Sequence, residues 1–172
     1  MPATVQATIA ARIDRLHPAA KRTLSAAAVI SAKVDRNLLE SLGIDPAPED
    51  LVRGQFLDQI SFSRNPEYEF HHPLIRTVAY ESQLKSDRAD LHRKVAAAIE
   101  TRAPLAADEN AALIAEHLQA AGDQHAAYGW HMRAGAWATN RDINAARLSW
   151  DRGQTIADQL PADDPNRTAM LI

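Results

Sequence analysis

The central junction of this sequence reads Tyr68-Glu69-Phe70-His71-His72-Pro73-Leu74-Ile75-Arg76-Thr77-Val78-Ala79-Tyr80-Glu81. Tyr68, Phe70 and His72 occupy alternate positions, which is the period of a half-buried strand. Pro73 then stands where proline favours the first position of a helix. The helix that follows is amphipathic, with apolar residues at Leu74, Ile75, Val78 and Ala79. The sequence therefore predicts that a strand gives way to a helix at His72-Pro73.

The residues before this junction predict short helices and one β-hairpin. Apolar stripes and helix-start signals predict a helix over 5–16, another from Pro18, a third capped by Asp35 and ended by Gly43, and a fourth opened by Glu49 and Asp50. Residues 31–34 are interpreted as a break between helices. Ile60, Phe62 and Arg64 alternate before a turn at Asn65-Pro66, which indicates a hairpin. Helices followed by a hairpin are the order of a winged helix, with the wing at 60–72.

The residues after the junction predict antiparallel helical hairpins. A long helix over 87–102 links the two parts, and Ala103-Pro104 marks the boundary. Large, small and aromatic residues recur at the spacing of a tetratricopeptide (TPR)-like unit, at Trp130, Ala134, Trp137, Ala146, Trp150 and Gly153. The sequence thus predicts a mainly α fold, with a winged-helix domain at 1–103 and TPR-like repeats at 104–172. Residues 167–172 read as the start of a further helix, so we expect a repeat array cut short at its C-terminus.

The composition limits the functional classes. The 172 residues carry a formal net charge of −3 and a pI near 6.1, without the basic stripe typical of free-standing DNA-binding domains. The chain has no cysteine, which excludes disulfides and thiolate metal sites and fits the cytoplasm. The sequence shows neither a long apolar run nor a signal-peptide pattern, so we expect no membrane association.

The paired histidines are the main candidates for a functional site. Strand alternation is expected to turn His72 inward with Phe70 and His71 outward. His72 then lies at a helix N-terminus, where an imidazole can donate to a phosphate oxygen. The alternative is a half-buried histidine that only caps the helix. A metal site is disfavoured because two adjacent strand residues cannot both face one ion.

The sequence gives little support for a metal site, a catalytic site or a DNA-binding surface elsewhere in the chain. His117, His125 and His131 are separated by eight and six residues, which do not repeat on one helical face, so they are interpreted as surface or packing residues. The sequence contains no phosphate-binding glycine loop and no nucleophile elbow, so we expect no catalytic residue in this chain. The helix before the wing carries Glu49, Asp50 and Asp58 against Arg53, a balance that repels DNA phosphates.

Several segments together resemble a known family. These are Thr4-Val5-Gln6-Ala7-Thr8-Ile9-Ala10-Ala11-Arg12-Ile13-Asp14-Arg15-Leu16, Ala19-Ala20-Lys21-Arg22, residues 70–81, Leu91-His92-Arg93, and Ala115-Glu116-His117-Leu118 with Ala121-Gly122-Asp123. They resemble the segment that follows the P-loop ATPase core in bacterial STAND-type signalling proteins, over nearly the whole chain. The family carries a class III adenylate/guanylate cyclase domain or a LuxR-type DNA-binding domain. In its alanine-rich composition, the chain is most similar to actinobacterial, mycobacterial-type cyclase proteins.

The family resemblance also bears on His72. His72-Pro73-Leu74 is similar to the Met-His-Asp motif of plant resistance proteins and apoptotic ATPases, whose histidine contacts bound ADP. His72 matches that histidine, whereas His71 replaces the methionine and Pro73 replaces the aspartate. The resemblance implies that His72 is a nucleotide-phosphate sensor, without the contribution of the aspartate.

The resulting expectation is a non-catalytic regulatory fragment of an ATP-binding class III adenylate cyclase with a STAND ATPase. The fragment itself needs no cofactor, while the ATPase of the parent protein binds ATP or ADP with Mg. The implied partners are that upstream ATPase domain and an effector or protein bound by the TPR-like arm. The alternatives are the same segment of a LuxR-family regulator, a DNA-binding winged helix, and a plain helical scaffold.

Overall fold

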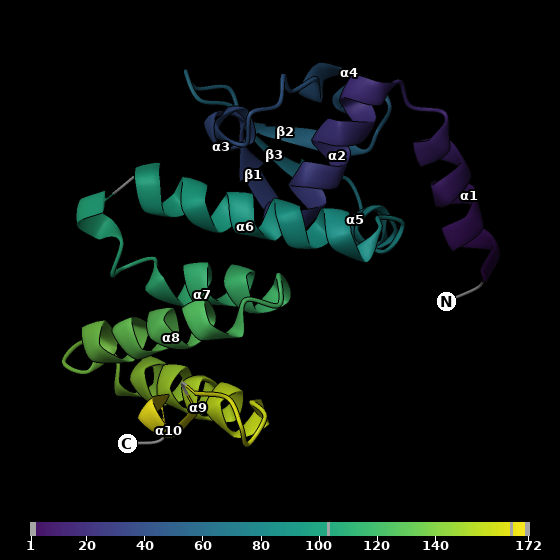
Figure 1. Cartoon of the computed structure of the whole chain (residues 1–172). Helices are drawn as coiled ribbons and strands as arrows, with labels where there is room; N and C mark the ends of the chain where they lie inside the picture. Colours follow the sequence, from purple (N-terminus) through teal and green to yellow (C-terminus); the bar gives the residue numbers. More distant parts are fainter. Residues whose placement is uncertain (1–2, 103, 166, 171–172) are drawn as a thin grey trace. The chain divides into compact units, whose positions relative to one another are not determined.

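The computed structural model describes residues 3–102, 104–165 and 167–170. The fold is mainly helical, with a small three-stranded antiparallel sheet (Figure 1). The chain forms two compact units, residues 1–91 (unit 1) and 92–172 (unit 2). The division lies inside one helix, α6 (Lys85–Arg102), whereas the sequence places a domain boundary after that helix. The boundary at 103–104 stays a prediction.

Unit 1 contains the whole sheet. Its elements are α1 (Ala3–Asp14), α2 (Pro18–Ile30), β1 (Lys33–Asp35), α3 (Arg36–Ser41), α4 (Pro48–Arg53), β2 (Leu57–Ser61), β3 (Glu67–Phe70), α5 (Pro73–Glu81) and the start of α6. Local signals set several of these bounds. Pro18 and Pro73 each open a helix, and the Asp35 carboxylate accepts a hydrogen bond from the Leu38 N–H at 2.8 Å, as the cap of α3. Gly43 follows α3 with a φ of +74°, a conformation that glycine adopts without strain.

The sheet has the strand order β1-β3-β2 and is antiparallel throughout. β1 was not predicted, because residues 31–34 read as a break; Val34 in fact pairs with Tyr68 of β3. The hairpin is present but begins and ends earlier than predicted. Phe62 lies beyond the end of β2, and β3 ends at Phe70, two residues before His72.

The core of unit 1 lies around α2. Five consecutive buried residues end this helix, and small alanines among them let other elements approach closely: Ala26, Ala27, Ala28, Val29 and Ile30. Leu24 of the same helix is also fully buried. Leu39 from α3, Leu51 from α4 and Leu57 from β2 are fully buried in the same unit. Burying such side chains supplies most of the favourable free energy of folding.

Unit 2 consists of helices joined by short turns. After the end of α6 come η1 (Pro104–Ala106), α7 (Ala111–Ala120), α8 (Gln124–Ala138), α9 (Ile143–Gln159) and α10 (Arg167–Met170). α7, α8 and α9 lie in successive layers, each in contact with the next (Figure 1). The predicted further helix at 167–172 is helical over Arg167–Met170, and residues 171–172 lie outside the described residues.

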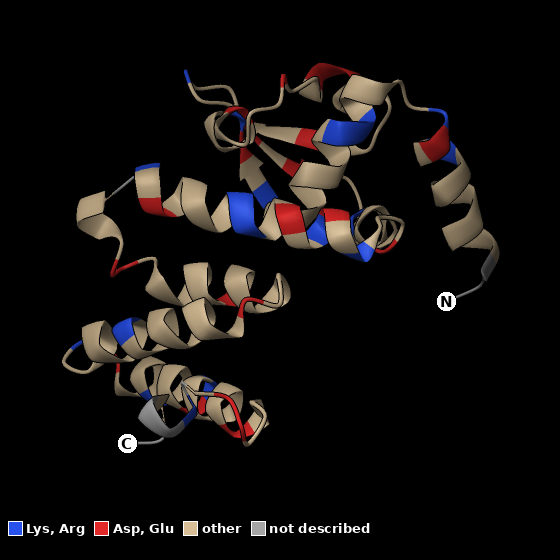
Figure 2. Ribbon diagram, viewed as in Figure 1, with Lys and Arg blue, Asp and Glu red and all other residues tan. Residues whose placement is uncertain are grey.

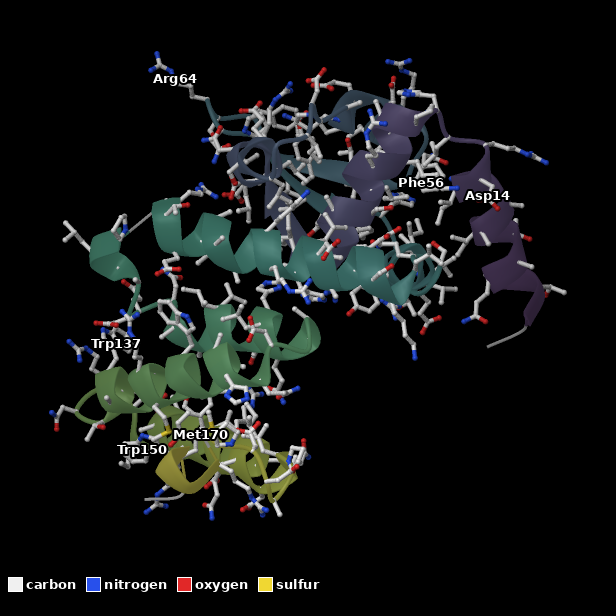
Figure 3. The ribbon with its side chains drawn as sticks, viewed as in Figure 1. Asp14, Phe56, Arg64, Trp137, Trp150 and Met170 are labelled. Atoms are coloured by element: carbon white, nitrogen blue, oxygen red, sulfur yellow. The ribbon has the colours of Figure 1, made fainter. Side chains whose placement is uncertain are left out.

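Small residues bring α8 and α9 together. A methyl group added at Gly135 would collide with the indole ring of Trp150, which Figure 3 labels on α9. A methyl group at Gly153 would stand 3.1 Å from the Met132 sulfur. Aromatic and small residues therefore pack against one another between these helices. Within the described ranges, no helix combines the length and the apolar character needed to cross a membrane.

Candidate functional site

His72 is the N-cap of α5. Its backbone is extended, with φ −148° and ψ 137°, and its Nδ1 accepts a hydrogen bond from the Leu74 N–H at 3.1 Å. The side chain is exposed, so the prediction that His72 points inward is wrong. The reason is that β3 ends at Phe70, and the alternation of strand side chains ends with it.

The capping bond fixes the roles of the two ring nitrogens. Because Nδ1 of His72 accepts, the proton of the neutral imidazole lies on Nε2. Nε2 is therefore a hydrogen-bond donor at the start of α5. The backbone of this first turn is already occupied: Pro73 has no N–H, Leu74 donates to the His72 ring, and Ile75 donates to the His72 carbonyl at 2.9 Å. An anion at this position would be bound by side chains and the helix dipole, and not by free N–H groups.

An open groove of about 390 Å³ lies beside this cap, entirely within unit 1. Residues from α1, the histidine pair and α5 line it, namely Thr4, Val5, Thr8, Ile9, Arg12, His71, His72 and Ile75. Both histidines therefore border the same groove, whereas strand alternation predicted opposite faces. The volume lies in the range of small-ligand sites.

His71 is tied to the hairpin. Its Nδ1 lies 2.9 Å from both carboxylate oxygens of Asp58 on β2. The two side chains are each half exposed, so the pair contributes little to stability, but it orients the ring. The structure thus joins Asp58 to His71, which lines the groove, a contact that the sequence does not indicate.

Arg12 brings positive charge to the same groove. Its Nη2 donates to the Gly54 carbonyl at 2.7 Å, and its guanidinium carbon lies 4.7 Å from the centroid of the Phe56 ring. Phe56, labelled in Figure 3, is buried and holds the guanidinium by a cation–π contact. Sequence reasoning missed Arg12, because nothing local distinguishes it from a solvated arginine on a helix.

Among the described residues, no group of three or more histidine or acidic side chains could hold a metal ion. Apart from His17 at the start of α2, the other histidines lie in unit 2. His117 and His131 are buried, and His125 is exposed beside Asp164 at 3.1 Å. The structure pairs His117 with His92, Nδ1 to Nδ1, at 2.8 Å. Sequence reasoning did not find that pair, because its members are 25 residues apart.

The surface around α4 is acidic and internally paired. Asp50 bonds His17 at 2.5 Å and Arg53 at 3.2 Å, and Glu49 bonds Arg36 at 2.8 Å. The hydrogen bond from His17 is the main cause of a lowered Asp50 pKa, so this carboxylate stays charged. Figure 2 shows acidic residues near α4 and basic residues scattered over other elements. This arrangement does not attract a phosphate backbone.

Comparison with known proteins gives one distant relative. The chain is 27% identical over 161 residues to a protein of Rhizobium meliloti (strain 1021) that is described only as uncharacterized. The alignment covers 89% of this chain and 16% of the relative, so the chain spans about a sixth of the relative's length. No family model matches the chain. No solved structure matches it either.

Proposed function

We propose that this chain is a non-catalytic regulatory segment of a STAND-type ATPase signalling protein, most similar to those with a class III adenylate cyclase domain. In this proposal, unit 1 is a winged helix that packs against the ATPase, and the helices after residue 104 are a TPR-like arm for an effector or protein. The parent ATPase binds ATP or ADP with Mg, and the protein is cytoplasmic.

The observation that carries the proposal is the donor pair at the groove of unit 1. His72, whose Nε2 carries the proton of the neutral ring, and Arg12 both line one open groove at the start of α5. A cation and a neutral donor on one rim are suited to a phosphate group. The backbone cap holds the His72 ring in place, so a bound phosphate could shift the position of unit 1 on a neighbouring domain.

The element order of unit 1 supports the winged-helix part of the proposal. Helix, short strand, two helices and hairpin follow one another, and the first strand joins the hairpin through β3. In unit 2, the close approach of Gly135 to Trp150 supports paired helices of the TPR type. The relative from Rhizobium meliloti (strain 1021) contains a similar segment within a much longer chain, which agrees with a regulatory segment.

ADP retention by the parent protein tests the sensor. We expect His72→Asn to speed ADP release, because asparagine can keep the helix cap while the Nε2 donor is lost. The matched control is His125→Asn, which alters an exposed histidine that is bonded to Asp164 and does not line the groove. Unchanged ADP release in the His72 variant would leave His72 as a cap only, which is the plain-scaffold alternative.

The chain alone should show neither ATPase nor cyclase turnover, and turnover that a substitution in this chain abolishes would contradict the proposal.

A DNA-binding winged helix is the second candidate, and the sheet topology of unit 1 is the observation that favours it. The acidic surface at α4 opposes it. A mobility-shift experiment with duplex DNA at low salt separates the two candidates, because the regulatory segment predicts no shift. The same segment in a LuxR-family regulator would place the DNA contact in another domain, so the chain alone would again show no shift.

A further inference from the structure

Unit 2 buries three imidazoles on three different helices. His92 lies on α6, His117 on α7 and His131 on α8, with exposed fractions of 6%, 5% and 0%. A buried imidazole is tolerated when it is neutral and hydrogen-bonded, whereas its protonated form loses hydration. These three residues are therefore packing groups whose protonation would place a charge in the interior of unit 2.

The bond between His92 and His117 depends on protonation. Their Nδ1 atoms lie 2.8 Å apart, and the ring centroids are separated by 5.1 Å. One Nδ1 must carry a hydrogen and the other must accept it. If both rings are protonated, both Nδ1 atoms become donors, so the bond is lost and two positive charges stand in contact.

His131 has a separate reason to stay neutral. Its Nε2 lies 3.3 Å from the Gln119 Oε1, and its Nδ1 has no hydrogen-bond partner among the described residues. Burial lowers the pKa of His131 most, the charge of Arg152 lowers it further, and Glu116 opposes both. The neutral ring is therefore the form that fits between α7 and α9.

Several charged groups on the helices of unit 2 form ion pairs or hydrogen bonds. Glu116 of α7 forms an ion pair with Arg152 of α9. Arg93 of α6 donates to the Ala121 carbonyl at the end of α7. On α8, Arg133 is bound to Asp108 before α7. A proton on His131 would thus add charge beside a carboxylate, Glu116, that already has a guanidinium partner.

We propose that unit 2 is an acid-sensitive element, in which protonation of His92, His117 and His131 loosens the packing of α7 against its neighbours. The proposal is independent of the nucleotide-sensor proposal for unit 1. As the pH falls below the ordinary histidine pKa of about 6.5, the unfolded or open form takes up protons before the closed form does. The closed form is therefore fully stable above that pH and is destabilised progressively below it.

Tryptophan fluorescence isolates this unit. The three tryptophans of the chain, Trp130, Trp137 and Trp150, all lie on α8 and α9. Urea unfolding of the full chain, followed by this signal at pH 7.5 and pH 5.5, measures the folding equilibrium of unit 2. We expect the folding equilibrium constant to fall by at least about tenfold between the two values.

Asparagine variants identify the groups responsible. His117→Asn removes one titrating ring and offers an amide that can still bond His92. We therefore expect a smaller fall of the folding equilibrium constant of unit 2 between pH 7.5 and pH 5.5. His71→Asn alters an exposed histidine of unit 1. In this variant, the folding equilibrium constant of unit 2 should fall between pH 7.5 and pH 5.5 by as much as in the unaltered chain. An equilibrium constant that does not change with pH in the unaltered chain would overturn the proposal. The proposal would also be overturned if this equilibrium constant fell in His117→Asn and in His131→Asn by as much as in the unaltered chain.

If these variants do not fold, an NMR titration of the unaltered chain tests whether the buried histidines take up protons as unit 2 loosens. The ring C–H signals of His92, His117 and His131 should shift only below the ordinary histidine pKa of about 6.5, together with the fluorescence change. Titration of all three buried histidines at or above a pH of about 6.5 would overturn the proposal.

Discussion

Gly129 and Gly135 lie on the same helix, α8, but have different surroundings. A methyl group at Gly135 meets the Trp150 ring, whereas a methyl group at Gly129 has no neighbour within 4 Å. The first glycine is therefore required by packing between α8 and α9. The second has only the intrinsic cost of a glycine inside a helix.

Alanine substitutions at these two positions should have opposite effects. We expect Gly135→Ala to reduce the free energy of unfolding of unit 2 by about 1–3 kcal/mol, because the Trp150 ring must move. Gly129→Ala should raise it by up to about 1 kcal/mol, because alanine favours the helix. Urea unfolding followed by tryptophan fluorescence measures both. Equal effects of the two variants would show that the α8–α9 contact is not tight.

His72 has two places in unit 1, since its Nδ1 caps α5 and the residue lines the groove. His72→Ala removes the cap and should destabilise unit 1 by about 1 kcal/mol, measured by urea unfolding with far-UV circular dichroism. His72→Asn should restore most of that stability. If both variants match the unaltered chain, the capping bond contributes nothing to the stability of unit 1.

At the scale of elements, α1 is held to unit 1 by few residues. Ile9 and Ile13 are buried, Val5 is 43% exposed, and the described packing of α1 is mainly against α5. Arg12 adds its bonds to Gly54 and Phe56. The groove therefore depends on a helix with a small buried face.

Truncation of that buried face should release α1. Ile13→Ala removes a fully packed side chain, a change that costs about 2–5 kcal/mol in protein cores. We expect faster amide hydrogen exchange throughout α1, measured by mass spectrometry, with the exchange of α8 unchanged. Val5→Ala, on the exposed side of the same helix, should have little effect. Unaltered exchange in Ile13→Ala would mean that other contacts hold α1.

At the scale of the whole molecule, each compact unit has its own fully buried residues. Leu24 has an exposed fraction of 0% in unit 1, and Ile156 has 1% in unit 2. Residues in separate cores and without shared neighbours contribute additively to stability.

Core truncations should therefore act on one unit at a time. Leu24→Ala should weaken unit 1 by about 2–5 kcal/mol and leave the tryptophan-monitored transition in place. Ile156→Ala should shift that transition to lower urea. Comparison of circular dichroism with tryptophan fluorescence distinguishes the two units. A single transition that both substitutions shift equally would show that the chain unfolds as one cooperative body.

The sequence by itself determined the features that depend on neighbouring residues. Pro18 and Pro73 open their helices and Asp35 caps α3, because these effects act within one helical turn. The mainly helical character and the existence of a hairpin follow from apolar periodicity in the same way. The identification of His72 as a residue at the start of a helix also needed only Pro73 and the residues around it.

Only the tertiary structure decided the features that depend on distant partners. β1 is three residues long and exists because β3 pairs with it, so no local pattern could indicate it. The end of β3 at Phe70, and not the alternation of residue types, placed His71 and His72 on one groove. The contacts of Arg12 with Phe56 and of His92 with His117 join residues 44 and 25 positions apart. Local signals fix where helices begin, whereas the burial and the bonding of a side chain depend on which distant segment lies against it.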